Sequence, residues 1–316
     1  MARTIGAIGD LTVDIIIPGL SRIPEWGQEV EIGKPILRLG GNIGNMAVGA
    51  SALKSDFRIF SIVGKDDDGS FILNRIQELN LDADDIEITD QESTCKTYAC
   101  LRNDGERFML TYKGTLECIE STMIKSNIST DIVFLGGWCL PPRVEEERLI
   151  QCIEYWKADQ KIVSTDLIWS DDTWNHKNLL TNFLNKIDIL FMNESELFAL
   201  TGEASFDKAV NKVKTMMGMH GQPDGRLCVI KLGAKGAALI EGDMIFRAGA
   251  YPVKPVDTVG AGDLFNIGFL HAMFQIGMDS QNALEFASTF ASVFISKYYD
   301  SPPTQNDIME LMKQLA

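Results

Sequence analysis

The 316-residue sequence has few histidines and no closely paired cysteines, which excludes several kinds of site. Its three histidines lie far apart, and its six cysteines include no C-x-x-C pair. Structural zinc sites need closely spaced Cys and His ligands, and small disulfide-stabilised folds need regularly spaced cysteines. We therefore expect reduced thiols in a cytoplasmic protein, without a zinc centre.

Long apolar runs and an excess of basic residues are also absent. The stretch IVFLGGWCL is too short to span a bilayer, and MARTIGAIGDLTVDIII carries Asp10 and Asp14, which is typical of a strand and not of a signal peptide. Lys and Arg number 29 against 44 Asp and Glu, a net charge of −15. An acidic chain is poorly suited to gripping phosphate backbones or anionic lipids, so we expect neither nucleic acid nor membrane as a partner.

The chain further lacks internal repeats, low-complexity tracts and an early G-x-G-x-x-G turn. The first two absences indicate a single folded unit, residues 1–316. The third argues against a nicotinamide oxidoreductase.

From residue 130 onward the sequence alternates short apolar runs with helical stretches. The runs are DIVFLGG (131–137), KIVSTDL (161–167), DILFMN (188–193) and CVIKLG (228–233). Apolar runs without polar alternation are typical of parallel strands covered on both faces, and the helices between them indicate crossover connections. The predicted fold is therefore α/β, with a mainly parallel central sheet flanked by helices. Ligands of such sheets bind beyond the carboxyl ends of the strands.

The N-terminal part has a different pattern. Residues 12–38 contain several prolines and no helical stretch, and residues 95–114 predict a hairpin with its turn at Asn103–Gly105. These two segments are expected to form a small antiparallel β lid beside the main domain. Such a lid could close over a ligand, or pair with a second copy of the chain to make a homodimer.

One stretch, DTVGAGDLF (257–265), places flexible backbone and two carboxylates where a helix begins. Gly260, Ala261 and Gly262 would provide first-turn amides without intrahelical partners, at the positive end of the helix dipole. Together they predict an anion-binding turn, with Asp263 beside it and Asp257 before it. In isolation the stretch is more typical of an ordinary glycine turn with an aspartate cap, and the strand before it, the helix after it and Asp257 favour the anion-binding turn.

Five short motifs, in order along the chain, resemble the ribokinase-like (PfkB) carbohydrate kinases. They are GDLTVDI (9–15), GGNIGNMAVGASAL (40–53), NESE (193–196), KLGAKGA (231–237) and DTVGAGDLF (257–265). Each motif is weak alone, but their ordered combination spans nearly the whole chain. The resemblance implies an ATP-dependent kinase, with Mg²⁺, that phosphorylates a hydroxymethyl group of a sugar or sugar derivative.

The resemblance also implies roles for individual residues. Asp263 would accept the proton of the attacking hydroxyl, while the amides of residues 260–262 stabilise the transferred phosphoryl group. At a helix N-terminus this carboxylate is expected to be ionised at neutral pH. The sugar-binding residues would be Asp14, Gly40, Gly41 and Asn45, together with Asp263.

For ATP, the resemblance implies contacts from Asn193, Glu196, Lys231, Gly233, Gly236, Gly262 and Ser288. Glu196 would lie near Mg²⁺, through water, since Mg²⁺ keeps several waters. Asp257 is a further candidate, as a ligand of a monovalent cation. Asn193 and Glu196 also fit a helix capping box, and the two interpretations are compatible.

Two regions depart from the family pattern. After the mid-chain strand Asp166 fits, but Ile168 and Ser170 stand where many members have Asn and Arg. Near the C-terminus Ser288 and Tyr299 replace an Asn and a Gly. Because Ser170 stands in place of the Arg, a substrate contact made through that Arg is absent here.

Two other functions remain open at this point. A nucleoside kinase of the same fold would need an aromatic surface for the base, which Trp26, Tyr112 or Trp138 could provide. A non-catalytic sugar sensor would bind a sugar without turnover, although the intact Asp263 and its glycine turn argue against it.

Overall fold

The computed structural model describes residues 3–102, 107–119, 124–125, 127–136, 145–168, 184–219, 221, 224–297 and 302–315. The predicted turn at 103–105 lies outside these residues, as do Trp138, Ser170 and Tyr299. Within the described part of the chain, no helix is long and apolar enough to cross a membrane. The described cysteines, which exclude Cys139, are all free thiols, as expected.

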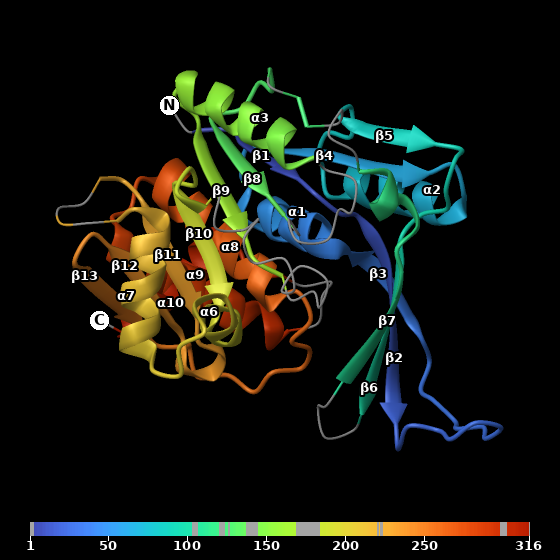
Figure 1. Cartoon of the computed structure of the whole chain (residues 1–316). Helices are drawn as coiled ribbons and strands as arrows, with labels where there is room; N and C mark the ends of the chain where they lie inside the picture. Colours follow the sequence, from blue (N-terminus) through green and yellow to red (C-terminus); the bar gives the residue numbers. More distant parts are fainter. Residues whose placement is uncertain are drawn as a thin grey trace.

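A nine-stranded sheet forms the centre of the molecule (Figure 1). Its strands run in parallel from one edge as far as β11, and the last two pair antiparallel. In spatial order the strands are β5 (Ile86–Thr89), β4 (Phe57–Gly64), β1 (Ile5–Ile8), β8 (Ile132–Leu135), β9 (Ile162–Asp166), β10 (Ile189–Asn193), β11 (Leu227–Lys231), β12 (Ala237–Glu241) and β13 (Met244–Ala248). The predicted mainly parallel sheet is thereby confirmed.

Helices cover both faces of this sheet because its central strands are apolar on both sides. On β8, for example, Phe134 packs in one core and Val133 in the other. One face carries α1 (Gly41–Leu53), α2 (Asp67–Glu78), α8 (Ala261–His271), α9 (Ser280–Ile295) and α10 (Gln305–Leu315). The other carries α3 (Glu146–Ala158), α6 (Glu194–Thr201) and α7 (Phe206–Met217). The sheet, with apolar side chains on both of its faces and a layer of helices on each face, makes a three-layer α/β fold.

A second, four-stranded sheet projects from the main domain (Figure 1). Its strands, in spatial order, are β3 (Ile36–Gly40), β2 (Thr12–Leu20), β6 (Lys96–Arg102) and β7 (Arg107–Tyr112). They lie in the predicted lid segments, and β6 and β7 form the predicted antiparallel pair. The two central strands, β2 and β6, pair in parallel, because they come from separate segments of the chain.

A buried histidine joins the C-terminal end of α8 to its neighbours. His271 Nδ1 lies 2.7 Å from Ser55 Oγ and 3.0 Å from Gln275 Oε1, and its Nε2 lies 3.2 Å from Gln305 Oε1. In neutral imidazole one ring nitrogen donates and the other accepts: Nε2–H can donate to Gln305 Oε1 while Nδ1 accepts from Ser55 Oγ, and the contact of Nδ1 with Gln275 Oε1 then has no donor. Burial lowers the pKa of His271 below its usual 6.5.

We expect His271 to make the fold less stable in acid. The unfolded chain takes up a proton near pH 6.5 and the folded chain resists it, so stability falls as pH drops below 6.5. Well above pH 6.5, His271 is neutral in both the folded and the unfolded chain, so it does not make the stability depend on pH. Thermal melts of the wild type and His271→Gln between pH 7 and pH 5 would test this. A melting-temperature difference between the two proteins that does not change with pH would contradict it.

Candidate active site

The N-terminal end of α8 is a glycine turn that no side chain caps. Gly260 precedes the helix at a φ of 78°, a conformation that residues with a Cβ rarely adopt. A Cβ on Gly260 would also lie 2.7 Å from Asn45 Cγ, so glycine is needed here for space as well. No side chain caps the first turn, and the Ala261 amide makes only a long, 3.4 Å hydrogen bond to the Thr258 carbonyl, so the turn offers amide donors for an anion.

Asn45 joins the two glycine motifs of the sequence. It lies in α1, which packs against α8, and its Nδ2 donates a 2.9 Å hydrogen bond to Asp263 Oδ2. The Oδ1 atom of Asn45 is buried and has no hydrogen-bond partner among the described residues. A substrate hydroxyl could therefore donate to Asn45 while Asn45 orients the carboxylate of Asp263.

In the ligand-free protein, burial acts against the ionisation of Asp263 that the helix dipole favours. Burial raises the pKa of Asp263 well above its usual 3.8, and the negative charge of Asp166 raises it further. Lys231 and the Asn45 hydrogen bond act in the opposite direction, but they are outweighed. Loss of water around the carboxylate costs more than the partial charge of the helix end returns.

Three neighbouring strands end in polar side chains that face the same region. Asp166 ends β9, Asn193 ends β10 and Lys231 ends β11. Lys231 Nζ forms a 2.5 Å ion pair with Asp166 Oδ2, which also accepts a 2.7 Å hydrogen bond from Asn266 of α8. Lys231, assigned to a phosphate by sequence, is thus held by a carboxylate. The pairing of Asp166 with Lys231 was not predicted from the sequence. The sequence feature that could have indicated a role for Asp166 is its position, as a charged residue at the carboxyl end of an apolar strand.

Asn193 and Glu196 form the capping box of α6. Asn193 Oδ1 accepts from the Glu196 amide at 2.9 Å, and Glu196 Oε2 accepts from the Asn193 amide at 2.7 Å. Burial, followed by the charge of Asp166, raises the pKa of Glu196 to about 7. The capping interpretation is correct, and it leaves a buried carboxylate at the carboxyl end of the sheet.

The donor set in this region fits a hard divalent cation. Asp166 Oδ1 is buried without a hydrogen-bond partner in the part of the chain that the structure describes, and Glu196 lies close enough for the two charges to interact. Mg²⁺ prefers carboxylate oxygens and water, and it binds through few protein ligands. Glu196 and Asp166 are therefore the residues that could hold it.

The predicted sugar-binding residues meet where β2 and β3 lead into α1. Asp14 accepts a 2.7 Å hydrogen bond from Thr12 Oγ1, and burial raises the pKa of Asp14. A Cβ on Gly40 would lie 2.0 Å from Asp14 Cγ, so only glycine lets this carboxylate approach the turn. Gly41 is next in the chain, and it begins the helix that carries Asn45. The structure therefore brings Asp14, Gly40, Gly41 and Asn45 together.

A cavity of about 500 Å³ opens beside the first turn of α8. Five of the seven residues predicted to contact a nucleotide line this cavity: Lys231, Gly233, Gly236, Gly262 and Ser288. Asn193 and Glu196 do not line it. Ser288 also donates a 2.8 Å hydrogen bond to the Gly249 carbonyl. The cavity has a polar end at Lys231 and Gly262 and an apolar wall further along. This combination of polar and apolar lining suits a ligand with a charged part and an apolar part.

The apolar wall was not predicted from the sequence. It comes from the extended segment after β13 and from α9, and it comprises Ala250, Tyr251, Pro252, Val253, Pro255, Ala291 and Ile295. The prolines at 252 and 255 are the sequence feature that could have indicated this wall, because they keep the segment out of regular secondary structure.

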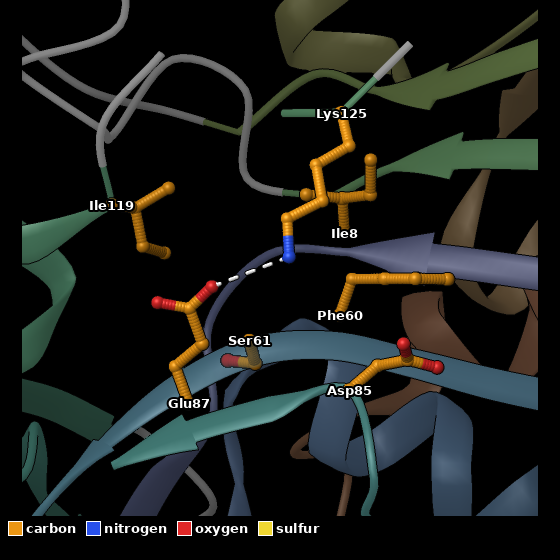
Figure 2. Close-up of a pocket in the computed structure, with 7 residues that line it drawn as sticks. All are labelled: Ile8, Phe60, Ser61, Asp85, Glu87, Ile119 and Lys125. Atoms are coloured by element: carbon orange, nitrogen blue, oxygen red, sulfur yellow. Dashed lines mark ion pairs between the residues drawn. The ribbon is translucent and has the colours of Figure 1, made fainter. Parts of the chain in front are cut away.

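A second hollow lies near the other edge of the sheet, between β1, β4 and β5 (Figure 2). Its volume is about 10 Å³, which is the space of about one water. Lys125 and Glu87 face each other across it at 3.6 Å. It is too small for a substrate, whereas the cavity beside α8 is large enough for one.

Comparisons with known proteins agree with this assignment. The family model described as "pfkB family carbohydrate kinase" matches residues 3–307. A 5-dehydro-2-deoxygluconokinase of Clostridium botulinum (strain Eklund 17B) is 23% identical over 95% of this chain and 93% of its own length. Two solved structures share the fold. One is the Arabidopsis thaliana ribokinase with ribose and ATP, with a TM-score of 0.80, 23% identity and 99% of each chain covered. The other is a provisionally named ribokinase II of E. coli with ATP and Mg²⁺, with a TM-score of 0.82, 19% identity and 99% of each chain covered.

The family match extends over almost the whole chain, and the fold and the uncapped glycine turn are those that the five motifs implied. Kinases of this family use ATP with Mg²⁺ and an alcohol group as the phosphoryl acceptor. The chain belongs to the pfkB family of carbohydrate kinases.

Proposed function

We propose that the protein transfers the γ-phosphoryl group of ATP to a hydroxymethyl group of a sugar or sugar derivative, with Asp263 as the base. The observation that supports this most directly is the position of Asp263. It lies on the first turn of α8, next to the nucleotide-sized cavity, and it is hydrogen-bonded to Asn45 from the sugar-side helix. The carboxylate of Asp263 is therefore bound to the sugar-side helix and follows Gly262, which lines the cavity, directly in the chain.

In this mechanism the protein mainly positions the reactants and stabilises charge. Asp14 accepts hydrogen bonds from sugar hydroxyls, and Asn45 orients the attacking hydroxyl against Asp263. Asp263 takes the proton of that hydroxyl as its oxygen bonds to the γ-phosphorus and the bond to the β-phosphate oxygen breaks. The amides of Gly260, Ala261 and Gly262 stabilise the negative charge of the transferred group, each worth about 3 kcal/mol by analogy with oxyanion holes.

When bound, Mg²⁺ would supply positive charge to the phosphates of ATP. Glu196 would hold it, through water, with Asp166 close by. Gly233, Gly236 and Ser288 line the part of the cavity that would contain the nucleoside. Lys231, already paired with Asp166, lies at the phosphate end.

The small sheet would act as the lid of this site. It carries Asp14 on β2, and closing it over the sugar would exclude water and limit hydrolysis of ATP.

A panel of acceptors tests the proposal. ADP release would be measured with ATP and Mg²⁺ and with sugars, sugar acids and nucleosides. The panel includes 5-dehydro-2-deoxygluconate and ribose, the compounds in the names of two related proteins. Turnover with a sugar or sugar acid would support the proposal and identify the acceptor. Turnover with nucleosides alone would favour a nucleoside kinase, and sugar binding without turnover would favour a sensor.

A sugar is favoured over a nucleoside because the candidate aromatic surfaces are exposed. The Trp26 side chain is fully exposed, and Tyr112 is 48% exposed, while Trp138 lies outside the described residues. A stacking site for a base would need a ring that is more enclosed than Trp26 or Tyr112.

We also propose that the small sheet is a homodimer interface. Leu37, Ile15, Tyr98 and Leu110 lie side by side in register across its four strands. Leu37 is 53% and Leu110 58% exposed, which is unusual for an apolar row of this length. A second copy of the sheet, packed on this row, would bury it.

Light scattering tests the dimer. We expect the mass of two chains for the wild type and of one chain for Leu110→Asp. Ile88→Asp is the matched control, because Ile88 is also 58% exposed but lies on β5 of the large sheet. A monomeric wild type, or equal dissociation by both variants, would contradict the proposal.

A further inference from the structure

An ion pair connects the small sheet to the segment before the anion-binding turn. Arg38 of β3 and Asp257 lie 219 positions apart in sequence, yet Arg38 Nη1 is 2.6 Å from Asp257 Oδ2. The Arg38 side chain is 7% exposed and that of Asp257 is 25% exposed. A largely buried charge pair between distant segments fixes their relative position, and removing one partner leaves the other uncompensated.

Asp257 uses its second oxygen to shape the chain that leads to Gly260. Its Oδ1 accepts a 2.9 Å hydrogen bond from the Val259 amide. The amides of Val256 and Asp257 both donate to the Ile295 carbonyl of α9, at 2.7 and 3.2 Å. Arg38 therefore holds the carboxylate that forms the turn immediately before the amides of residues 260–262.

On its other side Arg38 is the cross-strand partner of Asp14. The two residues are paired in register between β2 and β3, so their side chains are on the same face of the small sheet. The positive charge of Arg38 lowers the pKa of Asp14, against the larger effect of burial. Asp14, Arg38 and Asp257 thus form a line of alternating charge from the sugar side to the anion-binding turn.

This arrangement does not fit a monovalent cation at Asp257, the candidate site from the sequence. Both carboxylate oxygens already accept hydrogen bonds, one from a guanidinium and one from a backbone amide. The guanidinium also supplies the positive charge that a cation would bring.

We infer that Arg38 is a positioning residue of the kinase: it couples the sugar-binding strand to the anion-binding turn and takes the place of a monovalent cation. The inference rests on the proposed function, since it concerns the same site. It predicts that the wild type needs no potassium, and that a protein without the Arg38 charge does.

The test compares Arg38→Met with Lys96→Met. Lys96 also ties the small sheet to the main domain, through an ion pair with Asp68 of α2, but its strand position is opposite Val13 and not Asp14. The kcat and both KM values are measured in potassium chloride and in tetramethylammonium chloride of equal ionic strength. We expect the wild-type kcat to be equal in both salts. The kcat of Arg38→Met should be about 10²-fold lower, because its anion-binding turn is displaced. Potassium or guanidinium should partly restore the kcat of that variant. Lys96→Met should keep the wild-type kcat in both salts.

Two results would overturn the inference: activation of the wild type by potassium, or a kcat of Arg38→Met no lower than that of Lys96→Met. Asp257→Asn is a second variant in case Arg38→Met does not fold, because the asparagine can still accept from the Val259 amide. It should lose kcat as Arg38→Met does, and an unchanged kcat would count against the inference. Absence of wild-type turnover with any acceptor would instead refute the proposed function. The affinity for a non-hydrolysable ATP analogue, measured in the same two salts, would then still test the role of Arg38. Weaker binding by Arg38→Met that potassium reverses would support the inference. Equal affinities of the wild type and Arg38→Met would overturn it.

Discussion

Replacing Asp263 with asparagine should lower kcat by about 10²–10⁴-fold, the usual contribution of a general base. The carboxylate is buried on the first turn of α8 and is hydrogen-bonded to Asn45. Asparagine has the same shape, and it can still accept from Asn45, but it cannot take a proton from a hydroxyl. ADP release with the acceptor identified by the panel would measure the loss.

Binding and folding measurements separate this effect from structural damage. Burial disfavours the charged form of Asp263 and raises its pKa, so replacing the carboxyl with a neutral amide should not lower the melting temperature. Its affinity for a non-hydrolysable ATP analogue should stay close to the wild-type value. A kcat within a few-fold of the wild type would show that Asp263 is not the base.

The raised pKa of Asp263 also predicts how activity depends on pH. A base works only when ionised, and burial and Asp166 keep this carboxyl protonated above the pH at which an ordinary aspartate ionises. The kcat/KM should therefore rise with pH through the pKa of Asp263 in the free enzyme. An acid limb close to the usual value of 3.8 would contradict the environment described for this residue.

Replacing Lys231 with methionine should damage both stability and activity. The ion pair with Asp166 is 2.5 Å long, and its side chains are 15% and 6% exposed. Removing one partner of a buried pair costs about 3 kcal/mol or more, because the other charge is left without compensation. The loss of Lys231 also raises the pKa of Asp263 further, so the acid limb of kcat/KM should move to higher pH. Chemical denaturation and a pH profile would measure the two effects.

Two further variants serve as controls for Lys231. Lys235→Met removes a lysine from the same loop whose partner Glu194 is 3.6 Å away and whose side chain is 74% exposed, so stability should change little. Adding Asp166→Asn to Lys231→Met should restore stability, because no buried charge is then left alone. Equal destabilisation by Lys231→Met and Lys235→Met would show that the Asp166 pair contributes nothing.

The large sheet and the glycine turn of α8 could be predicted because their causes are local. Unbroken apolar runs specify strands covered on both faces: β8, β9 and β10 fall within three of the runs from residue 130, and β11 begins one residue before the fourth. Gly260 is needed both for a φ of 78° and for the space that Asn45 occupies, and both requirements are visible in sequence as glycine.

What the sequence did not reveal depends on partners that are distant along the chain. Lys231 meets Asp166 across 65 positions, and Arg38 meets Asp257 across 219. The pKa of Asp263 depends on burial by several elements, which outweighs the local helix dipole that sequence reasoning used. The parallel pairing of β2 with β6 likewise cannot be read from either segment alone.

The most direct test of the account is to identify the product made from ATP and the acceptor. Mass spectrometry and phosphorus NMR would be applied to reactions of the wild type and of Asp263→Asn. The account predicts a phosphate monoester on a hydroxymethyl group of the sugar with the wild type, formed in equal amount to ADP, and almost none with the variant. An acceptor that raises the melting temperature of the wild type while ATP stays intact, or while ADP forms with only free phosphate, would contradict it.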